Sequence, residues 1–242
     1  MLDSASVRAV LLDIEGTTTP VSFVYDVLFP YARANFAKFL QQHSHESSVQ
    51  AALAQLRSQR TSDLDSGRAV PPEAPTELET LIAYAHWLMS QDSKTGPLKT
   101  LQGMIWQEGY ETGELKGLVF SDVPGALRRW HDQGKQIFIY SSGSVLAQKL
   151  IFGHTDHGDL TSLLNGYFDT GVGSKSESSS YSKIAAGIGI PPAAILFLSD
   201  APRELDAANS AGLQTAHCVR PGNPYPHAPG HAAIRTFDSI PF

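Results

Sequence analysis

A short apolar run near the start of the chain ends on two acids, and this feature most constrains the possible folds. Residues 7–12 read Val-Arg-Ala-Val-Leu-Leu and lead directly into Asp13, Ile14 and Glu15, followed by Gly16 and three threonines. A short run of this kind is typical of a strand that is buried on both faces of a parallel sheet. Because open α/β sheets place their sites outside the carboxyl ends of their strands, we expect a functional site where this run stops.

The composition indicates a globular chain and argues against nucleic acids and membranes as partners. The 242 residues are 42% hydrophobic and 17% charged, and the net charge is −6, with none of the basic clusters that nucleic-acid binding requires. No apolar run approaches the roughly 18 residues of a membrane span, and residues 1–4 lack a signal-peptide pattern. The single cysteine, Cys218, excludes an intrachain disulfide and fits a reducing compartment. We therefore expect a cytoplasmic protein, with a nuclear pool left open. We also expect a monomer, which the composition does not decide.

Only helical patterns occur between Val21 and Leu115. Apolar residues recur at helical spacing over Pro20–Leu40, and again from Glu77 to Trp106. The intervening segment is polar, and its part from Arg57 to Pro75 is rich in Ser, Asp, Gly and Pro, which predicts a mobile loop. The sequence thus predicts a helical insertion after the first strand.

Strand and helix patterns alternate in the rest of the chain. Short apolar or β-branched runs predict strands at 136–140, 167–169, 195–198 and 215–219, and each interval between them contains a helical pattern. Such alternation is typical of a parallel sheet with right-handed crossovers. The segment from Pro224 to Gly230, rich in Pro and His, predicts an irregular tail.

Polar residues of complementary chemistry follow several of these strands or precede them in a loop. In chain order they are Asp13 and Glu15, Ser141 and Ser142, Lys175, and Asp200. Carboxylates with phosphate and water are the usual ligands of Mg²⁺, whereas hydroxyls, a helix N-terminus and an ammonium bind phosphate oxygens. A carboxylate can also attack phosphorus as a nucleophile. The residues together predict metal-assisted phosphoryl transfer.

The motifs that contain these residues resemble those of a known superfamily. Asp13-Ile-Glu-Gly-Thr17 resembles the first motif of haloacid dehalogenase (HAD) enzymes, usually D-x-D-G-T, and Ser141, Lys175 and Ser199-Asp200 match the later motifs in order. Longer segments are similar to the enolase-phosphatase E1 family: Leu12–Pro20, Leu28–Tyr31, Leu101–Gly103 with Trp106, Tyr140–Ser144, Gln148-Lys149, Phe152–His154 and Arg220–Asn223. This resemblance extends over nearly the whole chain.

The resemblance implies a fold and an activity. The fold is α/β, with a Rossmann-like HAD core and parallel sheet formed by residues 1–20 and 116–242, and a helical cap, residues 21–115, inserted after the first strand. The activity is that of an Mg²⁺-dependent, bifunctional enzyme of methionine salvage. Such enzymes convert 2,3-diketo-5-methylthiopentyl-1-phosphate to its enol and then, by dephosphorylation, to acireductone. The cap would close over the site and exclude water.

The resemblance also implies roles for single residues. Asp13 matches the nucleophile and a metal ligand, and Asp200 matches a second metal carboxylate. Ser141 and Ser142 match the phosphate-binding pair, and Lys175 matches the catalytic lysine that binds the phosphate.

Two acids have more than one possible role. Glu15 stands where the superfamily has a second aspartate, so acid/base catalysis and metal binding both stay open, and it is our first candidate for the enolisation base. Glu204, four residues after Asp200, could orient Lys175 or a metal-bound water. Phe23 and Trp106 could line a substrate pocket, but large aromatic residues in apolar patterns more often belong to the core.

Three other functions would share part of this pattern. A phosphoacceptor signalling domain also carries an acid at a strand end, but such domains are about 100–150 residues long and have no helical insertion. A dinucleotide-binding oxidoreductase would need G-x-G-x-x-G after the first strand, and that pattern is absent from the sequence. Within the same superfamily, the alternative is a phosphatase that acts on another small phosphate ester.

Overall fold

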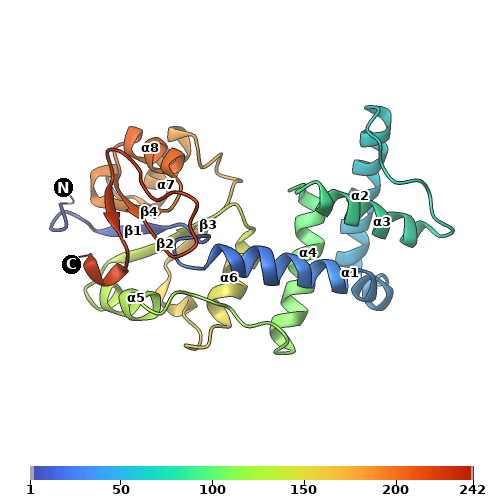
Figure 1. The fold of residues 1–242 in the computed structure, drawn as a ribbon, viewed down its shortest axis with the longest axis horizontal. Helices are drawn as coiled ribbons and strands as arrows, with labels where there is room; N and C mark the ends of the chain where they lie inside the picture. The colour runs from blue at the N-terminus through green and yellow to red at the C-terminus, as the bar shows by residue number, and fades with distance from the viewer. Residues whose placement is uncertain (1–2, 241) are drawn as a thin grey trace. The chain divides into compact units, whose positions relative to one another are not determined.

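The computed structural model describes residues 3–240 and 242, and its chain divides into two compact units. Unit 1 comprises Met1–Tyr25 and Lys116–Phe242, and unit 2 comprises Asp26–Leu115 (Figure 1). The roles of the two parts of the chain as a catalytic core and a cap stay predictions.

Unit 1 is organised around a parallel sheet that contains six strands in the described residues. Their spatial order is β3-β2-β1-β4-β5-β6. The strands are β1 (Ala9–Leu12), β2 (Gln136–Tyr140), β3 (Gly166–Phe168), β4 (Ile195–Ser199), β5 (Gln214–Cys218) and β6 (Ala232–Ile234). The expected α/β fold with a parallel sheet is confirmed, and the sequence missed only β6, which follows the irregular tail.

The register of β1 explains why the chain places polar residues at one edge of the sheet. Leu12, the last residue of β1, lies opposite Ile139 of β2 and Leu198 of β4. All four residues of β1 are buried, as a central strand requires. The residues that follow Leu12 and Leu198 along the chain therefore leave the sheet side by side.

Four helices cover the sheet of unit 1. In Figure 1, α5 (Val123–Asp132) and α6 (Val145–Gly153) lie on one face, and α7 (Ser178–Ile188) and α8 (Pro202–Ser210) lie on the other. Apolar side chains of the strands and of α7 and α8 form a continuous core: Leu11, Tyr140, Tyr181, Ile184, Phe197 and Leu205. Each such side chain contributes about 1.5–3 kcal/mol by burial.

All the regular secondary structure of unit 2 is helical, and residues 26–115 contain no strand. Its helices are α1 (Phe29–His43), α2 (Ser47–Asp65), α3 (Glu77–Ser90) and α4 (Gly96–Glu111). Pro30 lies in the first turn of α1, where a proline removes no helical hydrogen bond, and a π-helix, η1 (Phe23–Leu28), precedes it. The expected helical character of this segment is confirmed.

One prediction in unit 2 is wrong. Residues 57–65 do not form a loop, because α2 runs to Asp65. The helix buries Val49, Leu53 and Leu56, so packing of that narrow face stabilises a sequence whose other faces are polar. The Asp63 carboxylate also accepts a hydrogen bond of 2.6 Å from the hydroxyl of Tyr84 in α3. The irregular segment begins after Asp65.

Three short 3₁₀ turns complete the described chain: η2 (Thr161–Leu163), η3 (Pro192–Ala194) and η4 (Phe237–Ser239). Helix α7 starts at Ser178, within a run of three serines that precedes Tyr181. Within the described residues, no helix combines the length and the apolar character that crossing a membrane requires.

Candidate active site

A tight turn after β1 carries the first two acids. Asp13 is buried, and its backbone N–H donates to the Leu198 carbonyl at 3.0 Å, which continues the ladder with β4. The Ile14 carbonyl then accepts from the N–H groups of the three following threonines, at 2.9–3.2 Å, so the chain reverses within one turn. Gly16 has φ +69°, a conformation that favours glycine. The turn fixes the direction in which Asp13 leaves the sheet.

Gly16 also allows two oxygens to approach the backbone closely. A Cβ atom at this position would lie 2.4 Å from an oxygen of the Asp200 carboxylate and 2.8 Å from Oδ1 of Asn223. The Asn223 amide donates to the Gly16 carbonyl at 2.8 Å, whereas its buried Oδ1 has no hydrogen-bond partner among the described residues. The first motif, Asp200 and the loop after β5 therefore meet at Gly16.

Lys175 is buried between two carboxylates. Its Nζ donates to Oδ1 of Asp13 at 2.5 Å and lies 2.7 Å from Oε2 of Glu204. Burial disfavours the charged form, but the two carboxylates outweigh it and raise the pKa of Lys175 above its ordinary value. Lys175 is therefore an ammonium at neutral pH. Glu204 therefore contacts Lys175, and its role in orienting the lysine or a metal-bound water stays a prediction.

Asp200 follows β4 and is strongly perturbed by its surroundings. Burial, followed by the charges of Asp13 and Glu204, raises the pKa of Asp200 to about 7, and Lys175 offsets only part of this effect. Glu15, which is half-buried, adds a smaller contribution of the same sign. The site therefore holds more negative charge than its lysine neutralises, and a cation would be stabilised here.

The third set of predicted residues follows β2. The Ser141 N–H donates to the Phe168 carbonyl at 3.1 Å, and its hydroxyl accepts from the Gly143 N–H at 3.1 Å. Ser144 caps α6 by accepting from Ala147 N–H at 3.3 Å, so the turn presents Ser141, Ser142 and Gly143 immediately before a helix N-terminus. Such a turn suits an anion.

The structure thus gathers several predicted residues. Asp13, Lys175 and Asp200 interact with one another in unit 1. The serine turn follows the strand beside β1, and Glu15 lies within electrostatic reach of Asp200. The individual roles of these residues stay predictions.

Two further residues support this arrangement and were given no role by the sequence. The Ser199 hydroxyl donates to Glu204 at 2.9 Å and lies 3.4 Å from the second oxygen of Asp13. Gln148 is fully buried, and its amide donates to the carbonyls of Gly143 and Phe168, both at 2.9 Å. Ser199 directly precedes the motif residue Asp200, and Gln148 lies in a segment that resembles the family. Their positions within these motifs were the only sequence signal that could have indicated a role.

The two aromatic residues considered for a substrate pocket are both buried. Phe23 is 5% exposed and Trp106 is 9% exposed. The Trp106 indole donates to the Leu28 carbonyl at 2.8 Å, and its ring contacts Phe29. Trp106 therefore joins α4 to the start of α1 as a core residue.

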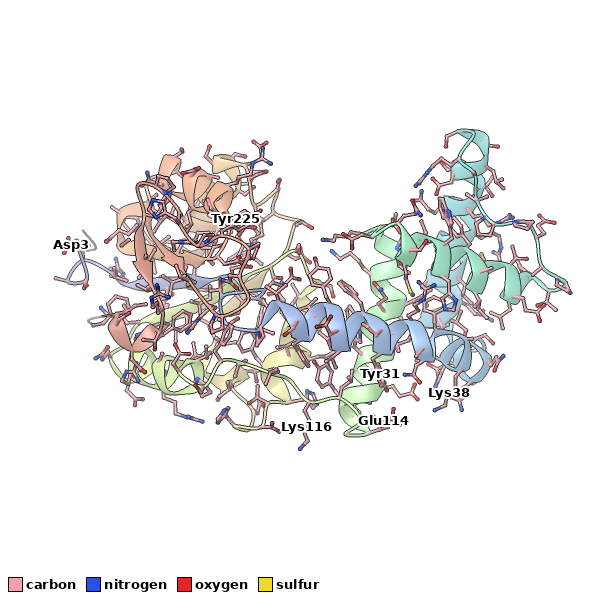
Figure 2. The ribbon with its side chains drawn as sticks, in the orientation of Figure 1. Asp3, Tyr31, Lys38, Glu114, Lys116 and Tyr225 are labelled. Atoms are coloured by element: carbon pink, nitrogen blue, oxygen red, sulfur yellow. The ribbon has the colours of Figure 1, made fainter. Side chains whose placement is uncertain are left out.

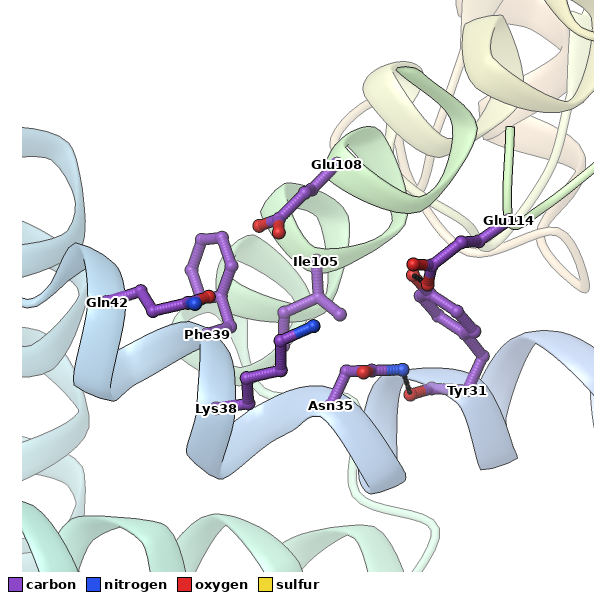
Figure 3. A pocket seen from close by; sticks show the side chains of 8 residues that line it. All are labelled: Tyr31, Asn35, Lys38, Phe39, Gln42, Ile105, Glu108 and Glu114. Atoms are coloured by element: carbon purple, nitrogen blue, oxygen red, sulfur yellow. Dashed lines mark hydrogen bonds between the residues drawn. The ribbon is translucent and has the colours of Figure 1, made fainter. Parts of the chain in front are cut away.

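Unit 2 has a hollow of its own between α1 and α4 (Figure 3). Its lining is of mixed charge: Tyr31, Asn35, Lys38, Phe39, Gln42, Ile105, Glu108 and Glu114. The Tyr31 hydroxyl donates to Glu114 at 2.8 Å, and both residues are labelled in Figure 2. Burial and this carboxylate raise the pKa of Tyr31 to about 12. None of the predicted site residues lines this hollow.

The donor set in unit 1 fits a hard divalent cation. Among the described residues, no three His, Cys, Asp or Glu side chains form a ready-made metal cluster. Mg²⁺ does not require one, because it is usually held by one or two carboxylates together with phosphate oxygens and water. The two buried carboxylates of Asp13 and Asp200, the excess negative charge and the unpartnered oxygen of Asn223 match that pattern.

The whole chain is similar to known proteins. A model for haloacid dehalogenase-like hydrolases matches residues 7–212. Enolase-phosphatase E1 of Pseudomonas aeruginosa (strain LESB58) is 47% identical over 235 residues, with 97% of this chain and 98% of the relative covered. Enolase-phosphatase E1 of Drosophila persimilis is 50% identical over 218 residues, which cover 89% and 86% of the two chains.

Solved structures are also similar to this chain. The UTR4 protein of Saccharomyces cerevisiae is 37% identical with a TM-score of 0.80, and the match covers 96% of this chain and 99% of that one. A dehalogenase, 18% identical with a TM-score of 0.53 and coverage of 97% and 96%, shares the fold alone.

Proposed function

We propose, because this chain belongs to the enolase-phosphatase E1 family of haloacid dehalogenase-like hydrolases, that it converts 2,3-diketo-5-methylthiopentyl-1-phosphate to its enol and then to acireductone and phosphate. The observation that carries the proposal is the buried cluster in which Lys175 contacts Asp13 and Glu204 beside Asp200. A nucleophilic carboxylate, a fixed ammonium and an excess of negative charge for a metal are what phosphoryl transfer by an aspartate needs.

The phosphatase step uses Asp13 as the nucleophile. A carboxylate oxygen of Asp13 forms a bond to phosphorus as the bond from phosphorus to the substrate's C1 oxygen breaks, which gives an aspartyl-phosphate and the enol product. Water then attacks that phosphorus and regenerates the carboxylate. Lys175, Ser141 and Ser142 bind the phosphoryl oxygens. The Ser199 hydroxyl contacts the carboxylates of Asp13 and Glu204 and orients them.

We further propose Mg²⁺ as the cofactor, with Asp13, Asp200 and Glu15 as the residues that hold it. When bound, it supplies Lewis-acid stabilisation of phosphate and carbonyl oxygens. The Asn223 Oδ1 beside Gly16 can accept a hydrogen bond from a coordinated water.

The enolase step removes a proton from the carbon that bears the phosphate ester. We propose Glu15 as the base, because it is half-buried in the turn after β1 and its charge acts on the neighbouring Asp200. The electron pair of the broken C–H bond forms the new C=C bond, and the neighbouring carbonyl oxygen becomes the enol oxygen. The same phosphate-binding groups hold the substrate in both steps.

In this proposal residues 1–20 and 116–242 form the catalytic core, and residues 21–115 form a cap that excludes water. All the proposed catalytic and phosphate-binding residues come from the first of these parts. We also propose that the enzyme is a monomer and that it is cytoplasmic, and the single free Cys218 supports a reducing compartment.

The test is an assay of the purified enzyme with Mg²⁺ and a hydrolytically stable diketone phosphate next to the natural substrate. We expect an enol absorbance with the stable compound, and enol followed by phosphate release with the substrate. Phosphate release with no enol signal would instead favour a phosphatase for another small phosphate ester. A stable phosphoprotein without turnover would contradict an enzymatic role.

A further inference from the structure

The loop that carries Lys175 is held by three side-chain hydroxyls on three consecutive carbonyl groups. The Tyr140 hydroxyl donates to the Gly173 carbonyl at 3.0 Å, and the Ser180 hydroxyl donates to the Ser174 carbonyl at 2.7 Å. The Tyr181 hydroxyl donates to the carbonyl of Lys175 itself at 2.7 Å. We call Tyr140, Ser180 and Tyr181 the hydroxyl clamp.

We propose that the hydroxyl clamp positions Lys175 for phosphate binding, so that its members are positioning residues of the reaction. The inference rests on the proposed function in one respect, namely that Lys175 binds the phosphate. It goes further by assigning a role to three residues that do not touch the reacting atoms.

All three members of the clamp are rigidly placed. Each is fully buried, Tyr140 at the end of β2 and Ser180 and Tyr181 in the first turn of α7. The two tyrosine rings meet edge to face with centroids 5.5 Å apart, and the Tyr181 ring also packs on Phe197 of β4 at 5.1 Å. The hydroxyls are therefore fixed to the sheet and to α7, and the loop is fixed to them.

A lysine needs such support more than a shorter side chain does. Its four-carbon stem is flexible, so ordering the ammonium costs conformational entropy unless the backbone beneath it is already fixed. The Lys175 Nζ also lies 5.7 Å from the centre of the Tyr140 ring, within reach of a cation–π interaction. Tyr140 thus acts on the loop through its hydroxyl, which binds Gly173, and on the Lys175 ammonium through its ring.

Gly173 supports the same interpretation. Its φ is +144°, and a Cβ atom there would lie 2.3 Å from the Ser180 hydroxyl oxygen. A side chain at this position would displace that hydroxyl from the Ser174 carbonyl. Glycine is therefore required for the loop to approach α7 closely enough to be clamped.

The two tyrosines of the clamp keep their donor protons at neutral pH. Burial raises the pKa of both tyrosines above the ordinary value, so both hydroxyls stay protonated in neutral and mildly alkaline solution. Each hydroxyl is engaged with a backbone carbonyl and is not available as an acid or base. Its contribution is geometric.

The test is a double-mutant cycle on the binding of inorganic phosphate, measured by calorimetry and ³¹P NMR in the presence of Mg²⁺. Tyr181→Phe and Ser180→Ala each remove one hydroxyl and retain most of the side-chain volume. We expect each to weaken phosphate binding about three- to tenfold, the cost of one hydrogen bond. In a Lys175→Met background the same changes should have no further effect, since the clamp acts only through the ammonium.

Tyr167→Phe is the matched control, because its buried hydroxyl has no hydrogen-bond partner among the described residues. We expect it to bind phosphate as the wild type does. If Tyr181→Phe and Ser180→Ala leave phosphate affinity unchanged, or weaken it equally with and without Lys175, the clamp does not act through the lysine and the proposal is wrong.

The cycle separates this proposal from the proposed function. Phosphate binding requires no turnover, so the clamp stands if the cycle shows coupling even when the diketone phosphate is not a substrate. If Lys175→Met leaves phosphate affinity unchanged, the clamp has nothing to position and this inference is overturned. With active enzyme, the clamp variants should raise KM more than they lower kcat.

Discussion

At the scale of single residues, the site is defined by an imbalance of charge. Lys175 is shared between Asp13 and Glu204, and the neighbouring Asp200 has its pKa raised to about 7. In the metal-free protein, Asp200 binds a proton more tightly than it does in the unfolded chain. Between its ordinary pKa and about pH 7 this carboxyl therefore makes the folded state less stable as pH rises, and above that range the full cost is present.

This imbalance leads to a prediction for Asp200→Asn. In EDTA at pH 8 the variant should unfold at a higher temperature than the wild type, by about 2–4 °C for each kcal/mol of relieved repulsion. Mg²⁺ should raise the unfolding temperature of the wild type and have little effect on the variant, because a carboxylate ligand is lost. Differential scanning fluorimetry with and without Mg²⁺ measures both effects.

Asp132→Asn is the control, since Asp132 is exposed at the end of α5. A metal-free Asp200→Asn protein that is less stable than wild type, or that Mg²⁺ stabilises as strongly, would argue against Asp200 as a repelled metal carboxylate.

At the scale of elements, the strands were easier to predict than the helices of unit 2. The buried run before Asp13 and the run at 136–140 each predict a strand. Both are short and apolar, and both are followed by a polar turn, as is typical of central strands. Helix α2 was partly mistaken for a loop, because only a narrow face is apolar and its stability comes from contacts with α3 and α4. Tertiary packing of this kind cannot be read from local composition.

The contact between α2 and α3 can be tested through Asp63. Burial opposes ionisation of Asp63, but hydrogen bonds from Tyr84, Arg68 and Gln59 outweigh it and hold the pKa below its ordinary value. A lowered folded-state pKa stabilises the fold above the ordinary carboxyl pKa, and this stabilisation is lost as pH falls below it.

We therefore expect Asp63→Asn to lower the free energy of unfolding by about 1–3 kcal/mol at pH 7, and by clearly less near pH 3. Urea titration followed by circular dichroism at the two pH values measures the difference. Asp65→Asn, at an exposed position of the same helix, is the matched control. An equal loss of stability at both pH values would contradict the proposal that the ionised Asp63 carboxylate stabilises the contact between α2 and α3.

At the scale of the whole molecule, Arg220 joins three distant segments of unit 1. Its guanidinium donates to both oxygens of Asp122 at 2.9–3.0 Å, to the Thr17 carbonyl at 3.1 Å and to the Arg235 carbonyl at 3.0 Å. It also lies 4.6 Å from the ring centres of Phe120 and Phe237. The turn after β1, the segment before α5 and the C-terminal segment thus depend on one buried cation.

Removing that cation should leave the Asp122 carboxylate, which is only 10% exposed, without its ion-pair partner, although it keeps hydrogen bonds from the Thr236 hydroxyl and the Phe237 N–H. We expect Arg220→Met to lower the free energy of unfolding by about 3–5 kcal/mol. Arg129→Met breaks an ion pair with Asp238 in which both side chains are about half exposed, and it should cost less than about 1 kcal/mol. Chemical denaturation of the two variants gives the comparison, and similar losses for both would contradict the structural role of Arg220.

The sequence predicted the chemical residues of the site more completely than the residues that position them. Asp13, Lys175 and Asp200 were found because each sits in a motif whose residue types match phosphoryl transfer. The hydroxyl clamp could not be found, because Tyr140 and Tyr181 read as ordinary core residues until the loop at 173–175 is seen to fold against them. Contacts between residues far apart in sequence depend on the fold, and single-sequence patterns carry no record of them.

The central claim is that one site first enolises and then dephosphorylates the same substrate, with Asp13 as the nucleophile of the second step. The most direct test is Asp13→Asn with the diketone phosphate and Mg²⁺, followed simultaneously by enol absorbance and by ³¹P NMR. We expect phosphate release to fall by at least roughly a thousandfold while an enol phosphate still accumulates. Phosphate release at the wild-type rate would contradict the account.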